Sequence, residues 1–101
     1  MSYQNRDGKA ISLDEWAVLF QDNDYSRIGL DDIGPYSVST VWLGAVHFGK
    51  TYFETMIFGP KDQGEFQERY QTEEQAIYGH NIVCDALRYT IGPIDRWILV
   101  G

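Results

Sequence analysis

Three consecutive segments with a two-residue alternation constrain the fold of this chain more than any other feature. Residues 36–45 are the clearest, because β-branched and aromatic side chains such as Val38 and Trp42 are typical of strands. Residues 51–58 and 65–71 repeat the alternation, and Gly- and Pro-containing loops separate the segments. Consecutive strands joined by short connections pair antiparallel, so we expect one antiparallel sheet.

Two stretches with helical periodicity flank these strands. Ser12 and Thr72 each begin a capping box, in which each hydroxyl should accept a hydrogen bond from a backbone N–H two or three residues on. The apolar spacing after them predicts a short helix from about 13 to 21 and a longer one from about 73 to 88. Gly79 within the longer helix indicates a close approach to the sheet.

The expected fold class is α+β, an antiparallel β-sheet of three to four strands flanked by an N-terminal short helix and a longer C-terminal helix. Residues 25–31 are the candidate fourth strand, at an edge, and residues 97–100 form a candidate short final strand. We expect residues 1–101 to be a single domain, with 1–11 as a flexible tail and 88–101 as a C-terminal extension.

Composition limits the classes of function. The net charge is −7, from 15 acidic and 8 basic residues. This balance disfavours direct nucleic-acid binding, because phosphate contacts dominate that affinity. Cys84 is the only cysteine, which excludes an intrachain disulfide and fits a reducing compartment. The polar start and the lack of a long apolar run predict a cytoplasmic protein with no membrane contact. We expect no cofactor.

The order of several motifs resembles a family of small uncharacterised proteins encoded by bacteriophages and bacterial genomes. The matching residues are Val38–Gly44 (VSTVWLG), Phe53–Phe58 (FETMIF), Arg69–Ala76 (RYQTEEQA) and Gly79-His80. The resemblance covers residues 12–87, and it implies a phage-type origin but no activity. The chain departs from the family at Ala45–Lys50, where the hairpin connection is compact.

Three residues are candidates for a ligand site: Trp42, Glu54 and His80. His80 lies on the apolar face of the longer helix, where its neighbours one turn away are Ala76, Ile77, Val83 and Cys84. With neither a carboxylate nor a second histidine at those positions, we expect His80 to be buried, hydrogen-bonded and unmetallated. Glu54 is either an acid–base group with a raised pKa or a cross-strand partner of Arg69 or Lys50. No residue is singled out as catalytic.

Acidic residues outside the helix starts suggest a protein-binding face. Asp22, Asp24, Asp31 and Asp32 are predicted to lie in loop or edge-strand positions, where helix capping does not explain them. The alternative is that they serve solubility or protect an edge strand from aggregation. If they serve binding, the partner is a protein with a basic surface.

Three functions remain open at this stage. The first is a non-catalytic protein that binds another macromolecule, such as a host or anti-defence target. The second is a small-ligand or nucleotide-binding protein, or an enzyme, with Trp42, Glu54 and His80 in a pocket between sheet and helix. The third is a virion structural or assembly component. A deep polar pocket favours the second, and self-association favours the third.

Overall fold

The computed structural model describes residues 2–46, 52–60 and 66–100, with side chains as far as residue 90. A four-stranded antiparallel sheet in the order β2-β3-β5-β6 forms the centre of the fold, which confirms the α+β class. The strands are β2 (Arg27–Ile33), β3 (Tyr36–Trp42), β5 (Phe53–Phe58) and β6 (Phe66–Tyr70).

The central hairpin has the predicted pairing. Strand β3 pairs with β5 in a register that joins Thr40 to Thr55 and Trp42 to Phe53. The β2–β3 turn contains Gly34, whose φ of 59° is left-handed and suits glycine. Part of the connection at 45–50, and Lys50 with it, lies outside the described residues.

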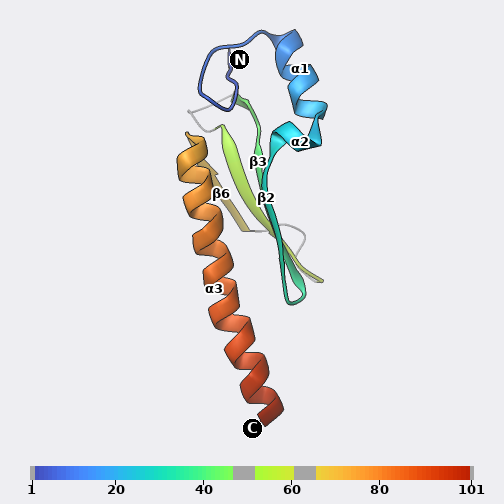
Figure 1. Cartoon of the computed structure of the whole chain (residues 1–101), viewed down its shortest axis with the longest axis vertical. Coiled ribbons are helices and arrows are strands. Elements are labelled where there is room, and N and C mark those ends of the chain that lie inside the picture. Colours follow the sequence, from blue (N-terminus) through green and yellow to red (C-terminus); the bar gives the residue numbers. More distant parts are fainter. Residues whose placement is uncertain (1, 47–51, 61–65, 101) are drawn as a thin grey trace.

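Helix α3 (Glu73–Val100) covers one face of this sheet and continues past its end (Figure 1). Its residues Ala76, His80 and Cys84 recur at helical spacing and are buried against the strands. Two buried clusters lie beneath it. One contains Trp42, Tyr52, Phe53, Tyr70 and Ala76, and the other contains Ile33, Val38, Ile57 and Cys84.

Both predicted helix starts are confirmed. Helix α1 (Leu13–Gln21) begins after Ser12, whose Oγ accepts a 3.1 Å hydrogen bond from the Glu15 N–H. The Thr72 hydroxyl accepts an equivalent 3.1 Å bond from the Gln75 N–H at the start of α3. Each hydroxyl pairs one of the N–H groups that a helix start leaves without a partner.

The C-terminal strand predicted for residues 97–100 is wrong, because α3 extends through them to Val100. A four-residue apolar run fits a helix as well as a strand, so periodicity does not separate the two. The predicted helix end near residue 88 is also too early, because α3 continues through Gly92 and Pro93, which are usual signals of a helix end.

The N-terminal segment differs from the expected tail. Strand β1 (Ser2–Tyr3) pairs antiparallel with β4 (Ala45–Val46), and Gln4 forms a bridge with Ala10. Backbone N–H and C=O groups pair with a neighbouring strand whatever the side chains are, so a polar segment can still form a strand. Helix α2 (Asn23–Ser26) also precedes β2, so the edge strand begins two residues later than predicted.

Candidate functional site

A chain of polar side chains crosses the space between the sheet and α3. The Thr40 and Thr55 hydroxyls share a hydrogen bond across β3 and β5, and Thr40 Oγ1 lies 2.7 Å from His80 Nδ1. His80 Nε2 lies 2.7 Å from Asp31 Oδ2 on β2. Both threonines are fully buried, and His80 is 5% exposed. The expectation that His80 is buried and hydrogen-bonded is therefore confirmed.

Cys84 joins this network one helical turn after His80. Its Sγ donates a 3.7 Å hydrogen bond to the same Asp31 carboxylate oxygen. One ligand atom from each of Asp31, His80 and Cys84 lies within 4.8 Å of the other two. The thiol and imidazole are buried, whereas the Asp31 side chain is 46% exposed. The cluster is therefore closed on the sheet side and open at its carboxylate.

The electrostatics of the cluster follow from these contacts. The hydrogen bond from His80 lowers the pKa of Asp31, so its carboxylate is ionised at neutral pH and accepts from His80 Nε2–H. Burial raises the pKa of the Cys84 thiol, and the negative charge on Asp31 raises it further. In this arrangement the Cys84 thiol stays protonated and donates a hydrogen bond to the Asp31 carboxylate.

The three proposed ligand-site residues do not share a pocket in the described structure. Thr55 faces α3, so its neighbour Glu54 faces away from the helix that carries His80. Glu54 accepts a 2.9 Å hydrogen bond from Arg69 Nε, which is one of the cross-strand pairs that the sequence suggested. Trp42 is fully buried in the core and donates from Nε1 to the Gln4 carbonyl.

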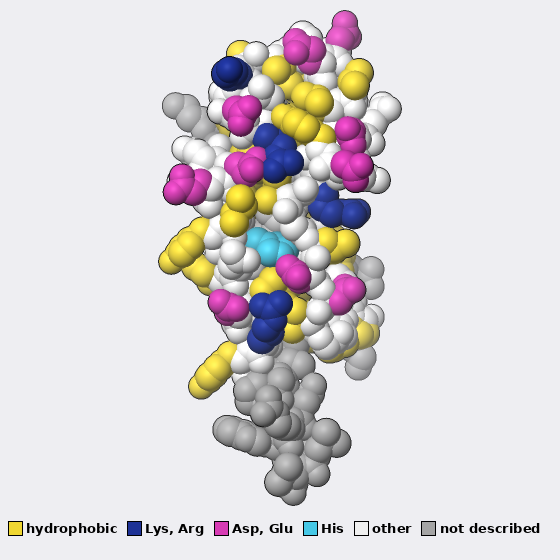
Figure 2. Space-filling model, viewed as in Figure 1, with side chains coloured by type: hydrophobic (Ala, Val, Ile, Leu, Met, Phe, Trp, Pro, Cys, Tyr) yellow, Lys and Arg dark blue, Asp and Glu magenta, His cyan; other side chains and the backbone are white. Residues whose placement is uncertain are grey.

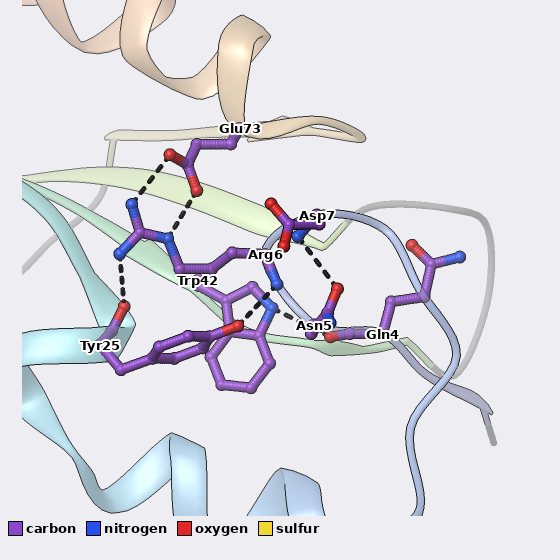
Figure 3. Close-up of polar contacts among 7 residues, drawn as sticks. All are labelled: Gln4, Asn5, Arg6, Asp7, Tyr25, Trp42 and Glu73. Atoms are coloured by element: carbon purple, nitrogen blue, oxygen red, sulfur yellow. Dashed lines mark hydrogen bonds and ion pairs between the residues drawn. The ribbon is translucent and has the colours of Figure 1, made fainter.

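A second polar cluster fastens the N-terminal segment to the rest of the chain (Figure 3). The Arg6 guanidinium donates to both carboxylate oxygens of Glu73 at the start of α3, at 2.5 and 2.8 Å. It also donates to the Tyr25 carbonyl, and the Arg6 backbone N–H donates to the Tyr25 hydroxyl. The ion pair lowers the pKa of Glu73 and raises that of Arg6. Arg6 therefore joins three segments that are distant in sequence.

Local structure accounts for three of the four acidic residues that the sequence left unexplained. Asp22 caps α2 by accepting from the backbone N–H groups of Asp24 and Tyr25. Asp31 pairs with His80, and Asp32 accepts a 2.6 Å hydrogen bond from the Ser37 hydroxyl. Asp31 and Asp32 are adjacent on β2 and so point to opposite faces of the sheet. A single binding face made of these four carboxylates has no support from this placement.

An apolar groove runs along the other flank of α3, beside the edge strand β6. It has a volume of about 520 Å³ and contains Phe66 and Tyr70 from the strand and Tyr78, Ile82 and Val83 from the helix. Tyr78 also borders an adjacent hollow with Ile77 and Glu74, and its side chain is 70% exposed. The groove is thus an accessible apolar surface with an aromatic ridge.

Gly79 gives the groove its shape. A Cβ at this position would overlap the Tyr70 ring, so the glycine lets the ring pass beneath the helix. This contact is the close approach that the sequence indicated. Among the residues that the structure describes, none gives the buried Tyr70 hydroxyl a hydrogen bond, and burial raises the pKa of this hydroxyl.

Sequence reasoning missed both the Asp31–His80–Cys84 cluster and the groove. Cys84 stands four residues after His80, which is a signal for a shared helical face. Asp31 is 49 residues from His80, and only the register of β2 against β3 brings the two together. The exposed positions Tyr78 and Ile82 are four apart and form an apolar stripe that does not face the core.

Comparisons with known proteins add no assignment: no family model, no curated protein and no solved structure matches this chain. Within the part of the chain that the structure describes, no helix has the length and apolar content needed to cross a bilayer.

Proposed function

We propose that this chain is a non-catalytic protein that binds another protein through the groove between β6 and α3. The observation that carries this proposal is the exposed apolar lining formed by Phe66, Tyr78 and Ile82. Contiguous exposed apolar surface is costly for a protein without a partner and marks interaction sites. Tyrosines are also enriched among the residues that contribute most to binding energy.

The polar network gives further support for a role other than catalysis. A nucleophile must reach its substrate, but the Thr40 hydroxyl is fully buried. Both nitrogens of His80 already have partners in Thr40 and Asp31. Glu54 is 8% exposed and paired with Arg69 on the far side of the sheet. The polar groups of these residues are hydrogen-bonded to one another instead of facing a substrate.

The partner that fits this surface presents apolar side chains flanked by lysine or arginine. The net charge of −7 favours a basic partner at long range, and Glu68 and Glu74 lie beside the two hollows. The resemblance to phage-encoded proteins makes a cytoplasmic host protein the class of partner that we propose. Apolar contacts then supply affinity, while charge speeds the encounter.

The experiment compares two tyrosines on the same helix. Tyr78 lines the groove, whereas Tyr89 is 80% exposed and lies outside both hollows, so Tyr89→Ala is the matched control for Tyr78→Ala. Tagged wild type and both variants are purified from producing cells, and the co-purifying proteins are identified by mass spectrometry. The captured protein is then purified, and its affinity and association rate are measured directly.

We expect Tyr78→Ala to weaken binding of the purified partner by at least about 30-fold, the effect of a central aromatic residue worth about 2 kcal/mol. Tyr89→Ala should bind as wild type does. The association rate should fall between about 50 and 500 mM salt, since screening shortens the reach of the charges. Equal binding by Tyr78→Ala and wild type would overturn the proposal. Self-association lost in Tyr78→Ala would favour an assembly role instead.

A further inference from the structure

The Asp31–His80–Cys84 cluster has the composition and position of a metal site. Its carboxylate oxygen, imidazole nitrogen and thiol sulfur come from β2 and from two positions one turn apart on α3. All three atoms lie within 4.8 Å of one another, so a single ion can contact them together. The cluster lies at one edge of the sheet, on the opposite flank of α3 from the binding groove.

We propose that Asp31, His80 and Cys84 form a site for a divalent metal ion, with Zn²⁺ as the best match. Thiolate, imidazole and carboxylate are the three ligand types that zinc takes in proteins, and Mg²⁺ and Ca²⁺ select against the thiolate. Three protein ligands leave one position of the tetrahedron for water, as in open zinc sites. This reverses the expectation from sequence that His80 is unmetallated.

One of the present distances already fits a zinc ion, and a second must lengthen. Zinc bonds of about 2.0–2.3 Å put tetrahedral ligand atoms roughly 3.3–3.8 Å apart. Cys84 Sγ and Asp31 Oδ2 are already 3.7 Å apart, whereas His80 Nε2 and Asp31 Oδ2 are 2.7 Å apart. Asp31 is the exposed member, so its side chain is free to rotate outward and open that distance.

Thr40 and Thr55 supply the outer hydrogen bonds that such a site needs. A histidine that binds metal through Nε2 carries its proton on Nδ1 and donates it to a neighbour. His80 Nδ1 lies 2.7 Å from the Thr40 hydroxyl, which can reverse from donor to acceptor because Thr55 is its next partner. The Thr40 hydroxyl can therefore hydrogen-bond to either tautomer of His80.

An ion can reach the cluster from solvent. Asp31 is the accessible member of the cluster, because its side chain is 46% exposed. Acidic side chains (magenta) are spread over the face drawn in Figure 2, so a cation is not repelled from it. Binding must displace the thiol proton, so affinity should rise with pH. Bound metal would tie α3 to β2 and stabilise the folded chain.

The test uses Co²⁺ and Zn²⁺ as probes on the full chain after removal of metal with a chelator. We expect one Co²⁺ per chain, with visible bands of tetrahedral cobalt and a thiolate-to-cobalt charge-transfer band, both abolished by equimolar Zn²⁺. Cys84→Ser and Asp31→Asn should each weaken binding by at least about tenfold, which is the lower limit reported for loss of an outer-shell group. Zn²⁺ should raise the Tm of the wild type.

The matched control is Asp32→Asn, which removes the adjacent charge on β2 without touching the cluster. It should bind metal as wild type does. A wild-type cobalt complex that lacks the charge-transfer band would overturn the proposal by itself, because the thiolate would then not be a ligand. So would metal bound equally well by Cys84→Ser and Asp31→Asn, since the ion would then sit on other acidic side chains.

Discussion

The two flanks of α3 differ in which side chains they bury against the sheet and which they expose. Toward β2, the buried side chains of Thr55, Thr40 and His80 are hydrogen-bonded in turn, and the series ends at the half-exposed Asp31. Toward β6, apolar side chains are exposed, and the groove that they line contains no described partner. The first flank pairs its polar groups within the chain, whereas the second leaves apolar side chains exposed to solvent.

This difference separates stability from binding. A buried polar group that loses its partner costs free energy, so changes in the Thr40–His80 network should destabilise the fold. An exposed apolar side chain such as Tyr78 makes few contacts in the free protein, so its replacement should weaken binding and leave stability nearly unchanged. Four predictions follow this contrast in order of decreasing effect.

The largest effect is expected for Thr40→Val, which keeps the shape of the side chain but removes the hydroxyl that joins Thr55 to His80. Two buried groups lose their partner at about 1–3 kcal/mol each, so the free energy of unfolding should fall by roughly 2–6 kcal/mol. Urea denaturation measures it. The double variant Thr40→Val/Thr55→Val should cost less than the sum of the two single variants, because it removes one orphaned hydroxyl. Strict additivity would contradict the network.

Gly79→Ala comes second. The added Cβ overlaps the Tyr70 ring, and overpacking typically costs about 1–3 kcal/mol, partly offset by about 1 kcal/mol of helix propensity. We expect a net loss of up to about 2 kcal/mol in thermal or urea unfolding. In a Tyr70→Leu background the same substitution should be neutral or stabilising. A loss of equal size in both backgrounds would show that the ring is not the obstacle.

The third effect concerns pH. The hydrogen bond from His80 lowers the pKa of Asp31 in the folded chain, so its stabilisation is present above the unfolded-state pKa of about 3.9. It is lost as the pH falls through the lower folded-state value. With chelator present, Asp31→Asn should therefore unfold with a shallower loss of stability below about pH 4 than wild type. Asp32→Asn is the control, and an unchanged acid branch in Asp31→Asn would contradict the assignment.

The smallest effect is expected for Tyr78→Ala. Its side chain is exposed at the ridge of the groove, so the free energy of unfolding should change by no more than about 0.5 kcal/mol. Chemical denaturation with a fluorescence readout is sufficient. A loss of 2 kcal/mol or more, roughly the cost of a buried large side chain, would mean that Tyr78 belongs to the core and not to a binding surface.

Local signals explain what the sequence predicts well. The capping residues Ser12 and Thr72, the alternation in β3 and the periodicity of α3 act over a few residues, so they are visible without tertiary information. The pairing of β1 with β4 at the N-terminus has no such local signal, because it depends on contacts with the distant residues Ala45 and Val46.

The candidate site depends on contacts between distant residues, and sequence reasoning reached only part of it. His80 is recognisable as a buried helix residue, but its partners Thr40 and Asp31 come from two strands whose register no local pattern gives. The sequence groups Glu54 with Trp42 and His80 as candidates for one pocket, since no local pattern tells which face of the sheet Glu54 occupies. Strand alternation places Glu54 on the other face, beside Arg69, once Thr55 is known to face α3.

The contrast between the buried flank and the exposed flank of α3 is tested most directly by the rate at which a thiol reagent modifies a cysteine on each of them. Cys84 is the only cysteine and is 1% exposed, so the metal-free native chain should react far more slowly than the denatured chain. In a Cys84→Ser background, Tyr78→Cys should react at the rate of a free thiol. Equal rates for Cys84 and the cysteine at position 78 in the native state would contradict the account.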